Sequence, residues 1–443
     1  MRDTWSHRLL LFAIFLLPWQ TRWIFSVALI GGEPSEYGQL SLYATEALIA
    51  LALLLRGRPM VLPRVGFVIQ GGYFLLGVAF ISLGLSSFFS VGLAQVLHLS
   101  FAFALLNLLL DVRTNVRAVA VAFVSGLILP SLLGWWQVIT GASPSSTWLG
   151  LAGKQAASAG VAVVETASGR MLRAYGTLPH PNIFGGFLAV GLLLMAWLVR
   201  FIRDRRAHVL SGVLVVFLSA TLIITFSRSA WLGIAIGFLV LIGLIVRRRR
   251  LPPSRALPMI ALGLLSVLAT LGVFYEQVFS RTLLVGRLEN LSVVERSSQY
   301  ARFDDVFLMN PLVGVGPGAY PFAMTQIDQD AKAWAYQPIH NTFLLVLGEL
   351  GALGLIALLY VLWRADQLNA KMAQTAGEMI GLALGIAMIV IALFDHYLFS
   401  LWPGMALGVL AIALPITWPF SVSASPKGEA PSQDAPVPHL DPS

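Results

Sequence analysis

Long apolar runs separated by short loops recur along this chain of 443 residues. A helix needs about 20 apolar residues to cross a bilayer. By that measure we expect about twelve spans, at residues 9–30, 39–55, 66–85, 91–110, 118–139, 182–199, 209–226, 229–246, 257–275, 341–363, 379–395 and 398–418. Repeated crossing of lipid requires helices, because a helix satisfies its own backbone hydrogen bonds. The pattern predicts an all-α, polytopic fold in which residues 1–420 form a single multi-span membrane domain.

The composition excludes several classes of protein. Charged residues make up 11% of the chain and hydrophobic residues 57%, whereas soluble domains are about 25% charged. There is no cysteine, which excludes disulfides and cysteine-ligated zinc. The net charge of +8 does not indicate nucleic-acid binding, because most arginines lie in short loops between apolar runs. The first run is too long for the apolar part of a signal peptide, so we interpret it as a retained span.

The basic loops predict the orientation of the chain. Five loops rich in Lys and Arg alternate with loops that are poorer in positive charge, and they are RGRPMVLPR (56–64), DVRTNVR (111–117), RFIRDRRAH (200–208), RRRRLPPSR (247–255) and WRADQLNAK (363–371). Such loops remain in the cytoplasm. Both termini are then cytoplasmic in a bacterial inner membrane, and residues 421–443, rich in Pro, Ser and Ala, form a disordered tail.

Two long connections, residues 140–181 and 276–340, fall on the opposite, periplasmic side. Long loops often carry function. The second is expected to contain short helices, because Ser292 followed by Glu295 matches a capping box that begins a helix. Three aromatic residues would share one face of that helix, namely Tyr300, Phe303 and Phe307.

Four polar motifs lie on the predicted outer side. They are RAYGTLPHPN (173–182), TFSRSAW (225–231), ERSSQY (295–300) followed by NPLVGVGPG (310–318), and PIHN (338–341). Three of them begin helices that run inward, so their free N–H groups point outward. Helix N-termini combined with arginines favour phosphate. Arg173, Arg228 and Arg296 would therefore suit a pyrophosphate, although a lone arginine at this depth more often contacts lipid headgroups.

His340 is the candidate base of this site. A helix N-terminus disfavours a charged imidazole, so a neutral ring is expected there, and a neutral ring can accept a proton from a sugar hydroxyl. A lone histidine at an interface is usually structural. His340 differs through its position beside Asn341 and the long loop. His180 is equally compatible with shaping a turn.

The order of the motifs resembles the O-antigen ligase and polymerase superfamily over residues 170–360. The resemblance rests on R-x-x-G-T-x-x-x-P-N, then S-R, then R-x3-aromatic with P-L-x-G-V-G, then H-N at the start of a span. It implies a GT-C-like membrane glycosyltransferase that is inverting and uses no metal, cofactor or nucleotide sugar. It also implies that His340, Arg228 and Arg296 are essential.

The same resemblance suggests supporting roles for Asn341, Asn182, His180 and Tyr300. Many relatives carry Trp where this chain has Tyr300, which leaves that position's role open. We expect a ligase that transfers O-antigen glycan from undecaprenyl pyrophosphate to a hydroxyl of lipid A–core at the periplasmic face. A glycan polymerase and a protein O-oligosaccharyltransferase share these motifs and stay open. A lipid-glycan transporter is a more distant alternative, because transporters place charged residues near the midplane.

Other polar residues have simpler interpretations. We expect Arg302 to pair with Asp304 or Asp305, Arg281 to be a surface charge, and GVGPG (314–318) to be a plain turn.

Asp328 and Asp330 offer a possible metal site, although exposed acids are more often only solvated. Glu46 and His98 fall inside predicted spans, where polar groups suggest function by default. A single buried hydrogen bond would also explain each of them.

Overall fold

The computed structural model describes residues 1–443 except 168, 250–255, 284–286, 374 and 419–443. The predicted cytoplasmic tail, 421–443, lies outside the described residues. Helices dominate the fold and the strands form small two-stranded sheets, so the chain is an all-α polytopic membrane protein. Among the described residues, 7 helices are long and apolar enough to cross a membrane, or up to 8 if the bent pair Leu257–Val273 and Tyr275–Thr282 counts as one. The twelve predicted spans are therefore too many by this measure.

The helices are α1 (Arg2–Phe15), α2 (Ala44–Arg56), α3 (Gly66–Leu85), α4 (Phe89–Leu110), α5 (Val116–Gly126), α6 (Ile128–Thr140), α7 (Pro181–Leu198), α8 (Arg205–Ile224), α9 (Arg228–Arg248), α10 (Ala256–Val273), α11 (Tyr275–Thr282), α12 (Arg287–Ala301), α13 (Phe303–Phe307), α14 (Tyr320–Ile327), α15 (Thr342–Met372), α16 (Ala376–Phe394), α17 (Tyr397–Ser400) and α18 (Trp402–Thr417). The hairpins are β1 (Arg22–Ser26) with β4 (Leu40–Tyr43), β2 (Leu29–Ile30) with β3 (Glu33–Pro34), β5 (Ala142–Ser143) with β6 (Lys154–Gln155), and β7 (Val163–Thr166) with β8 (Gly169–Leu172).

The first predicted span, residues 9–30, is wrong as a single helix. Helix α1 ends at Phe15, and β1 follows instead of a continued helix. Pro18 disfavours helix in the residue before it, and the aromatic and β-branched residues of β1 favour a strand. The segment between α1 and α2 therefore lies at one end of the bundle.

The predicted capping box is also wrong. Helix α12 begins at Arg287, so Ser292 lies inside the helix and not at its start. The aromatic face is interrupted as well, because α12 ends at Ala301 and α13 begins at Phe303. Phe303 stacks on Phe307 with ring centroids 5.9 Å apart.

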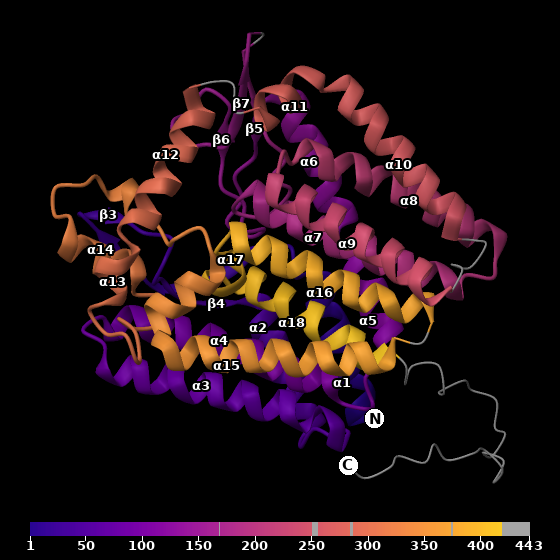
Figure 1. Cartoon of the computed structure of the whole chain (residues 1–443), viewed down its shortest axis with the longest axis horizontal. Coiled ribbons are helices and arrows are strands. Elements are labelled where there is room, and N and C mark those ends of the chain that lie inside the picture. Colours follow the sequence, from indigo (N-terminus) through magenta and orange to yellow (C-terminus); the bar gives the residue numbers. More distant parts are fainter. Residues whose placement is uncertain (168, 250–255, 284–286, 374, 419–443) are drawn as a thin grey trace.

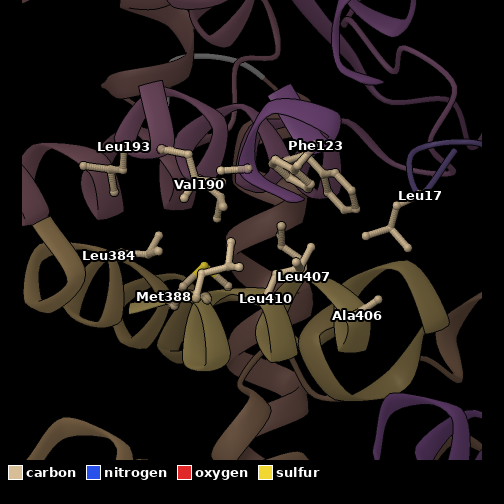
Figure 2. Packing of buried hydrophobic residues seen from close by; sticks show 14 of the residues in the cluster. Leu17, Phe123, Val190, Leu193, Leu384, Met388, Ala406, Leu407 and Leu410 are labelled. Carbon is tan, nitrogen blue, oxygen red and sulfur yellow. The ribbon is translucent and has the colours of Figure 1, made fainter. Parts of the chain in front are cut away.

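Helix α7 is the centre of the bundle. Of its most apolar stretch, 94% is buried, and its Val190 and Leu193 pack towards Leu384 of α16 and Leu407 of α18 (Figure 2). Close packing requires small residues here: a Cβ on Gly186 would lie 2.1 Å from the Tyr397 hydroxyl. A helix enclosed in this way provides a rigid support for the residues at its start.

Helix α15 is interrupted at Gly351, where the backbone is left-handed with φ +66°. The segment 311–316 fills the break and pairs with it through four backbone bonds: Ala352 N–H to Pro311 O (2.9 Å), Leu353 N–H to Leu312 O (3.2 Å), Val315 N–H to Gly348 O (3.0 Å) and Gly316 N–H to Glu349 O (3.0 Å). A Cβ on Gly351 would lie 2.2 Å from the Leu312 carbonyl carbon. The GVGPG stretch therefore begins inside this contact and is more than a plain turn.

The described parts of the basic loops, which exclude 250–255, share one end of the bundle. Four contacts link them: Arg56 with Asp111 (3.4 Å), the Arg117 guanidinium over Phe201 (4.1 Å), the Arg364 guanidinium over Phe67 (4.3 Å), and Arg248 donating to Ala373 O. The basic loops therefore lie together, as their alternation with less basic loops along the sequence predicted. Which side of the membrane they occupy stays a prediction.

That prediction can be tested by single-cysteine labelling, because the chain has no cysteine of its own. Ser158→Cys and Asp330→Cys, both at exposed positions, should react with a membrane-impermeant maleimide in intact spheroplasts. Arg203→Cys, exposed at the other end, should react only after permeabilisation. Labelling of Arg203→Cys in intact spheroplasts, with Ser158→Cys and Asp330→Cys protected, would reverse the orientation.

Candidate active site

The two long connections and the segment before α2 meet at the end opposite the basic loops. Three hydrogen bonds join them: Ser280 Oγ to Glu165 O (2.9 Å), Thr21 Oγ1 to Trp148 O (2.8 Å) and Thr177 Oγ1 to Pro18 O (2.7 Å). In Figure 1 the strands β5 to β7 and helix α11 lie at the top, with α12, α13 and α14 at the left. The motifs predicted to face outward thus share one end.

A buried polar chain joins the helix ends there. The Arg173 guanidinium donates from Nε to Thr225 O, before α9 (2.8 Å), and from Nη2 to Asn182 Oδ1 (2.7 Å). Asn182 Nδ2 donates to Asp395 Oδ2 (2.8 Å), just after α16. Thr342, the first residue of α15, donates to the Asp395 carbonyl (2.8 Å). Arg173 is 3% exposed, so its position suits holding the helix ends more than contacting a ligand.

Two arginines meet at the turn before α9. Phe226 adopts a left-handed φ of +50° and is fully buried, a conformation uncommon for a bulky residue. Ser227 then caps α9 by accepting from the Ala230 N–H. Arg228 Nη1 lies 3.4 Å from Arg281 O, and Arg281 Nε donates to Phe226 O (3.1 Å). Arg281 was expected on the surface, but it is 8% exposed.

His340 is held by α12. Its Nδ1 lies 2.8 Å from Gln299 Oε1, and its backbone N–H points at the same oxygen (3.4 Å). Because a backbone N–H can only donate, the shared atom is an acceptor, and Nδ1 carries the proton. The lone pair is then on Nε2. The Tyr300 hydroxyl lies 3.4 Å from the His340 carbonyl.

Asn341 and His180 act as helix caps. Asn341 Oδ1 accepts from the N–H groups of Phe343 and Leu344 (3.0 and 3.1 Å), and its Nδ2 donates to Leu393 O (3.2 Å). His180 Nδ1 accepts from the Asn182 N–H (3.1 Å), with Pro181 at the first position of α7. Both residues start helices whose N-termini face this site.

A second histidine faces the first. The rings of His396 and His340 are edge to face with centroids 5.0 Å apart, and Tyr37 packs against His396 at 5.8 Å. His396 and the neighbouring Asp395 were missed from the sequence. The available signal was an Asp-His pair at the junction of the last two predicted spans, with Asp395 at the end of one span and His396 directly after it.

Burial and Arg296 set the charge of these groups. Burial, assisted by Arg296, lowers the pKa of His340 to about 3. Burial likewise lowers the pKa of His396, with further contributions from His340 and Arg296. Burial raises the pKa of Asp395, and Arg296 opposes that rise. Arg296 thus reaches all three groups electrostatically, and neutral imidazoles are the resting form.

Several predicted partners are rearranged. Arg302 pairs with Asp328 and not with Asp304 or Asp305, because the break after α12 turns it towards the end of α14. Among the described residues, no group of three or more His, Asp or Glu side chains is placed to hold a metal ion. Glu46 and His98 form a buried pair, with Nδ1 and Oε1 2.6 Å apart.

Residues 213–359 match the family model described as O-antigen ligase, which confirms the resemblance seen in the motifs. The matched stretch contains Arg228, Arg296 and His340, whereas Arg173 and Asp395 lie outside it. No curated protein matches the chain.

The lowered histidine pKa values predict a pH-dependent stability. An unfolded histidine takes up a proton near pH 6.5, whereas His340 in the folded chain does so only near pH 3. The unfolded state therefore binds more protons below pH 6.5, so this contribution is complete above pH 6.5 and is lost as the pH falls. Replacing His340 by Gln should flatten the decline in stability between pH 6.5 and 4.5 by up to about 1.4 kcal/mol per pH unit. Denaturation in detergent over this range measures the effect, and parallel curves for the two proteins would contradict it.

Proposed function

We propose that this chain transfers a glycan from undecaprenyl pyrophosphate to a hydroxyl of lipid A–core at the periplasmic face of the bacterial inner membrane. The family match supports an enzyme of the ligase and polymerase type. The observation that carries the proposal is the contact between His340 Nδ1 and Gln299 Oε1 (2.8 Å). With the proton on Nδ1, Nε2 is left as a base, within electrostatic reach of Arg296.

The reaction needs help chiefly at the nucleophile. A lipid pyrophosphate is a good leaving group, whereas a sugar hydroxyl is a poor nucleophile near neutral pH. In the proposed step the acceptor oxygen attacks the anomeric carbon while its proton passes to His340 Nε2. The bond from that carbon to the pyrophosphate oxygen breaks in line, so the anomeric centre inverts. General-base help of this kind contributes about 100- to 10,000-fold.

Arginines are proposed to hold the leaving group. Arg296 lies close enough to affect His340 electrostatically, and Arg228 stands at the N-terminus of α9. Planar guanidinium groups bind phosphate oxygens in pairs, and a helix N-terminus adds donors for an anion. We therefore expect the pyrophosphate between these arginines without a metal ion or cofactor. Arg173, Asn182 and His180 are proposed as positioning residues behind them.

An apolar cavity supports a lipid-linked donor. It has a volume of about 220 Å³ and is lined by α3, α4, α15, α16 and α18. Along α15 its lining extends from Thr342, two residues after His340, to Asn369 near the opposite end. Part of a hydrocarbon chain can lie in such a cavity while the attached pyrophosphate reaches the proposed site.

The ligase, the polymerase and the protein O-oligosaccharyltransferase differ in the acceptor that they use. A polymerase would use a second lipid-linked glycan as acceptor, and a protein O-oligosaccharyltransferase would use a side-chain hydroxyl. Purified protein supplied with one donor and each acceptor in turn distinguishes the three. Transfer to lipid A–core alone supports the ligase.

Replacing His340 by Ala should lower transfer by about 100- to 10,000-fold, the scale of general-base catalysis, while the donor still binds. Transfer and donor binding are measured on the same purified protein, together with the anomeric configuration of the wild-type product. Loss of donor binding would instead make His340 a pyrophosphate ligand. A product that retains the donor's configuration would rule out a single displacement.

Replacing Arg296 by Ala should lower transfer by about a thousandfold, the scale of one lost electrostatic contact to a developing anion. The pH dependence of the residual activity gives a second measurement. Removing a nearby positive charge should raise the pKa of His340, so the acid limb of kcat/KM should move to higher pH. Arg296→Lys keeps the charge but loses the planar fork, so its acid limb should stay in place while transfer recovers only in part. Unchanged transfer in Arg296→Ala would make this residue a headgroup anchor.

A further inference from the structure

A second cavity, of about 360 Å³, is lined by charged, hydroxyl-bearing and apolar residues. Its walls come from β1, the β5–β6 hairpin and the chain just before His180, and its lining includes Arg22, Glu36, Lys154 and Tyr175. Ligand sites commonly have volumes of about 300–1,000 Å³ with a few converging polar groups. Arg228, Arg296 and His340 do not line this cavity.

Residues at two walls of the cavity connect to the histidines near the proposed base. On one wall Tyr175 packs against His180, with ring centroids 6.3 Å apart. On the other, Glu36 precedes Tyr37, whose ring packs against His396, and His396 faces His340. Arg296 approaches the same histidines from α12, which does not line the cavity. The cavity and Arg296 thus approach the histidines through different elements.

The charges in the cavity favour an anion. Arg22 and Lys154 are its cations, and Glu36 is the one carboxylate in its lining. Lys154 Nζ lies 4.9 Å from the centroid of the Tyr175 ring and, among the described residues, forms no ion pair. Burial lowers the pKa of Lys154, and Glu36 opposes that fall. A partly desolvated ammonium of this kind gains from an incoming negative group.

The remaining lining suits a sugar. Serine and threonine hydroxyls from the 143–147 stretch and Gln20 line the cavity beside the Tyr175 ring. An aromatic ring offers an apolar surface and hydroxyl groups offer hydrogen bonds, which together match the two faces of a pyranose. A sugar carrying an acidic substituent therefore accounts for both the polar lining and the excess positive charge.

We propose that this cavity binds the acceptor glycan, and that Lys154 and Arg22 hold an acidic group, a phosphate or a carboxylate, of that glycan. This inference rests on the proposed function. It places donor and acceptor on opposite sides of His340, with the pyrophosphate at the arginines and the acceptor hydroxyl directed from the cavity towards Nε2. Lys154 and Arg22 determine specificity and take no part in proton transfer.

If Arg22 binds the acceptor, the buried Glu46–His98 pair has a role in positioning it. Glu46 Oε2 accepts from the Tyr43 N–H (2.8 Å), while Oε1 contacts His98. The Tyr43 hydroxyl in turn accepts from Arg22 Nη1 (3.0 Å). The pair therefore positions Tyr43, and Tyr43 positions the guanidinium of Arg22, a residue that lines the cavity. Glu46 and His98 act as positioning residues.

The test measures acceptor binding without transfer. The His340→Ala protein, in detergent, is titrated with three lipid-linked disaccharides that differ in one substituent: a 6-phosphate, a uronic acid carboxylate, or a neutral hexose. At least one acidic compound should bind about tenfold or more tightly than the neutral one, the scale of one charge-assisted hydrogen bond. Which acid binds better identifies the group. Equal binding of all three would overturn the proposal.

Variants in the same background separate charge from structure. Lys154→Met should remove the preference for the acid and leave binding of the neutral compound unchanged, whereas Lys154→Arg should keep the preference. Glu36→Gln should strengthen binding of the acid, an effect that structural damage would not produce. Lys332→Met, at an exposed position in the second long connection, is the matched control and should change nothing. Equal losses for acidic and neutral compounds in Lys154→Met would contradict the assignment.

Failure of this inference differs from failure of the proposed function. The wild-type transfer assay tests the function and does not depend on which cavity holds the acceptor. Wild-type transfer combined with equal binding of all three disaccharides rejects the cavity alone. An acid preference without transfer to any acceptor rejects the function and keeps a site for acidic glycans.

Discussion

The buried chain from Arg173 through Asn182 to Asp395 is the interaction on which the end of the molecule opposite the basic loops depends. Through it and Thr342, the starts of α7 and α15, the approach to α9 and the end of α16 are fixed to one another. Hydrogen bonds between charged and polar groups strengthen in a low dielectric. Loss of one partner leaves an uncompensated charge and costs about 3–5 kcal/mol. The chain therefore gives a rigid base to a site that otherwise consists largely of loops.

The interrupted helix α15 anchors the second long connection, residues 276–340, in a similar way. The freed backbone groups around Gly351 bond to the segment 311–316, and the buried Glu349 carboxylate accepts from the Gly318 N–H (2.6 Å). Backbone left unpaired inside a membrane protein is costly, so the segment and the break stabilise each other. This contact attaches the second long connection to α15 at a point after α12. It therefore limits how far Gln299, in α12, can move from His340, which lies just before α15.

Sequence periodicity predicted the helical class, and charge predicted which loops lie together, because both depend on local composition. The motif argument brought Arg296 and His340 together, since helix starts on one side must share an end. Local patterns failed where tertiary contacts decided the outcome. Ser292 and Glu295 match a capping box, but α12 begins earlier. The first apolar run is apolar enough for a span, yet part of it pairs as a strand with β4.

The roles of individual polar residues were harder to predict. Nothing in the sequence separates Arg173, whose guanidinium is buried against Thr225 and Asn182, from Arg296, which lies near the histidines. The difference is one of burial and hydrogen-bond partners. The Asp395–His396 pair escaped notice because it occupies a connection of a few residues, where length gave no reason to expect function. Only the packing of α7, α15 and α16 makes that connection central.

Burial and Arg296 both lower the pKa of His340, which conflicts at first sight with its proposed role as a base. They keep His340 neutral, as a base must be, but a pKa of about 3 makes a weak base. The donor itself resolves this. A pyrophosphate bound to Arg296 would cancel much of the positive charge beside the imidazole, and a nearby anion stabilises the protonated ring. The base would then gain strength when the leaving group is in place, and lose it when the donor departs. Such coupling protects the site from protonation at rest and ties proton transfer to the presence of the bond to be broken.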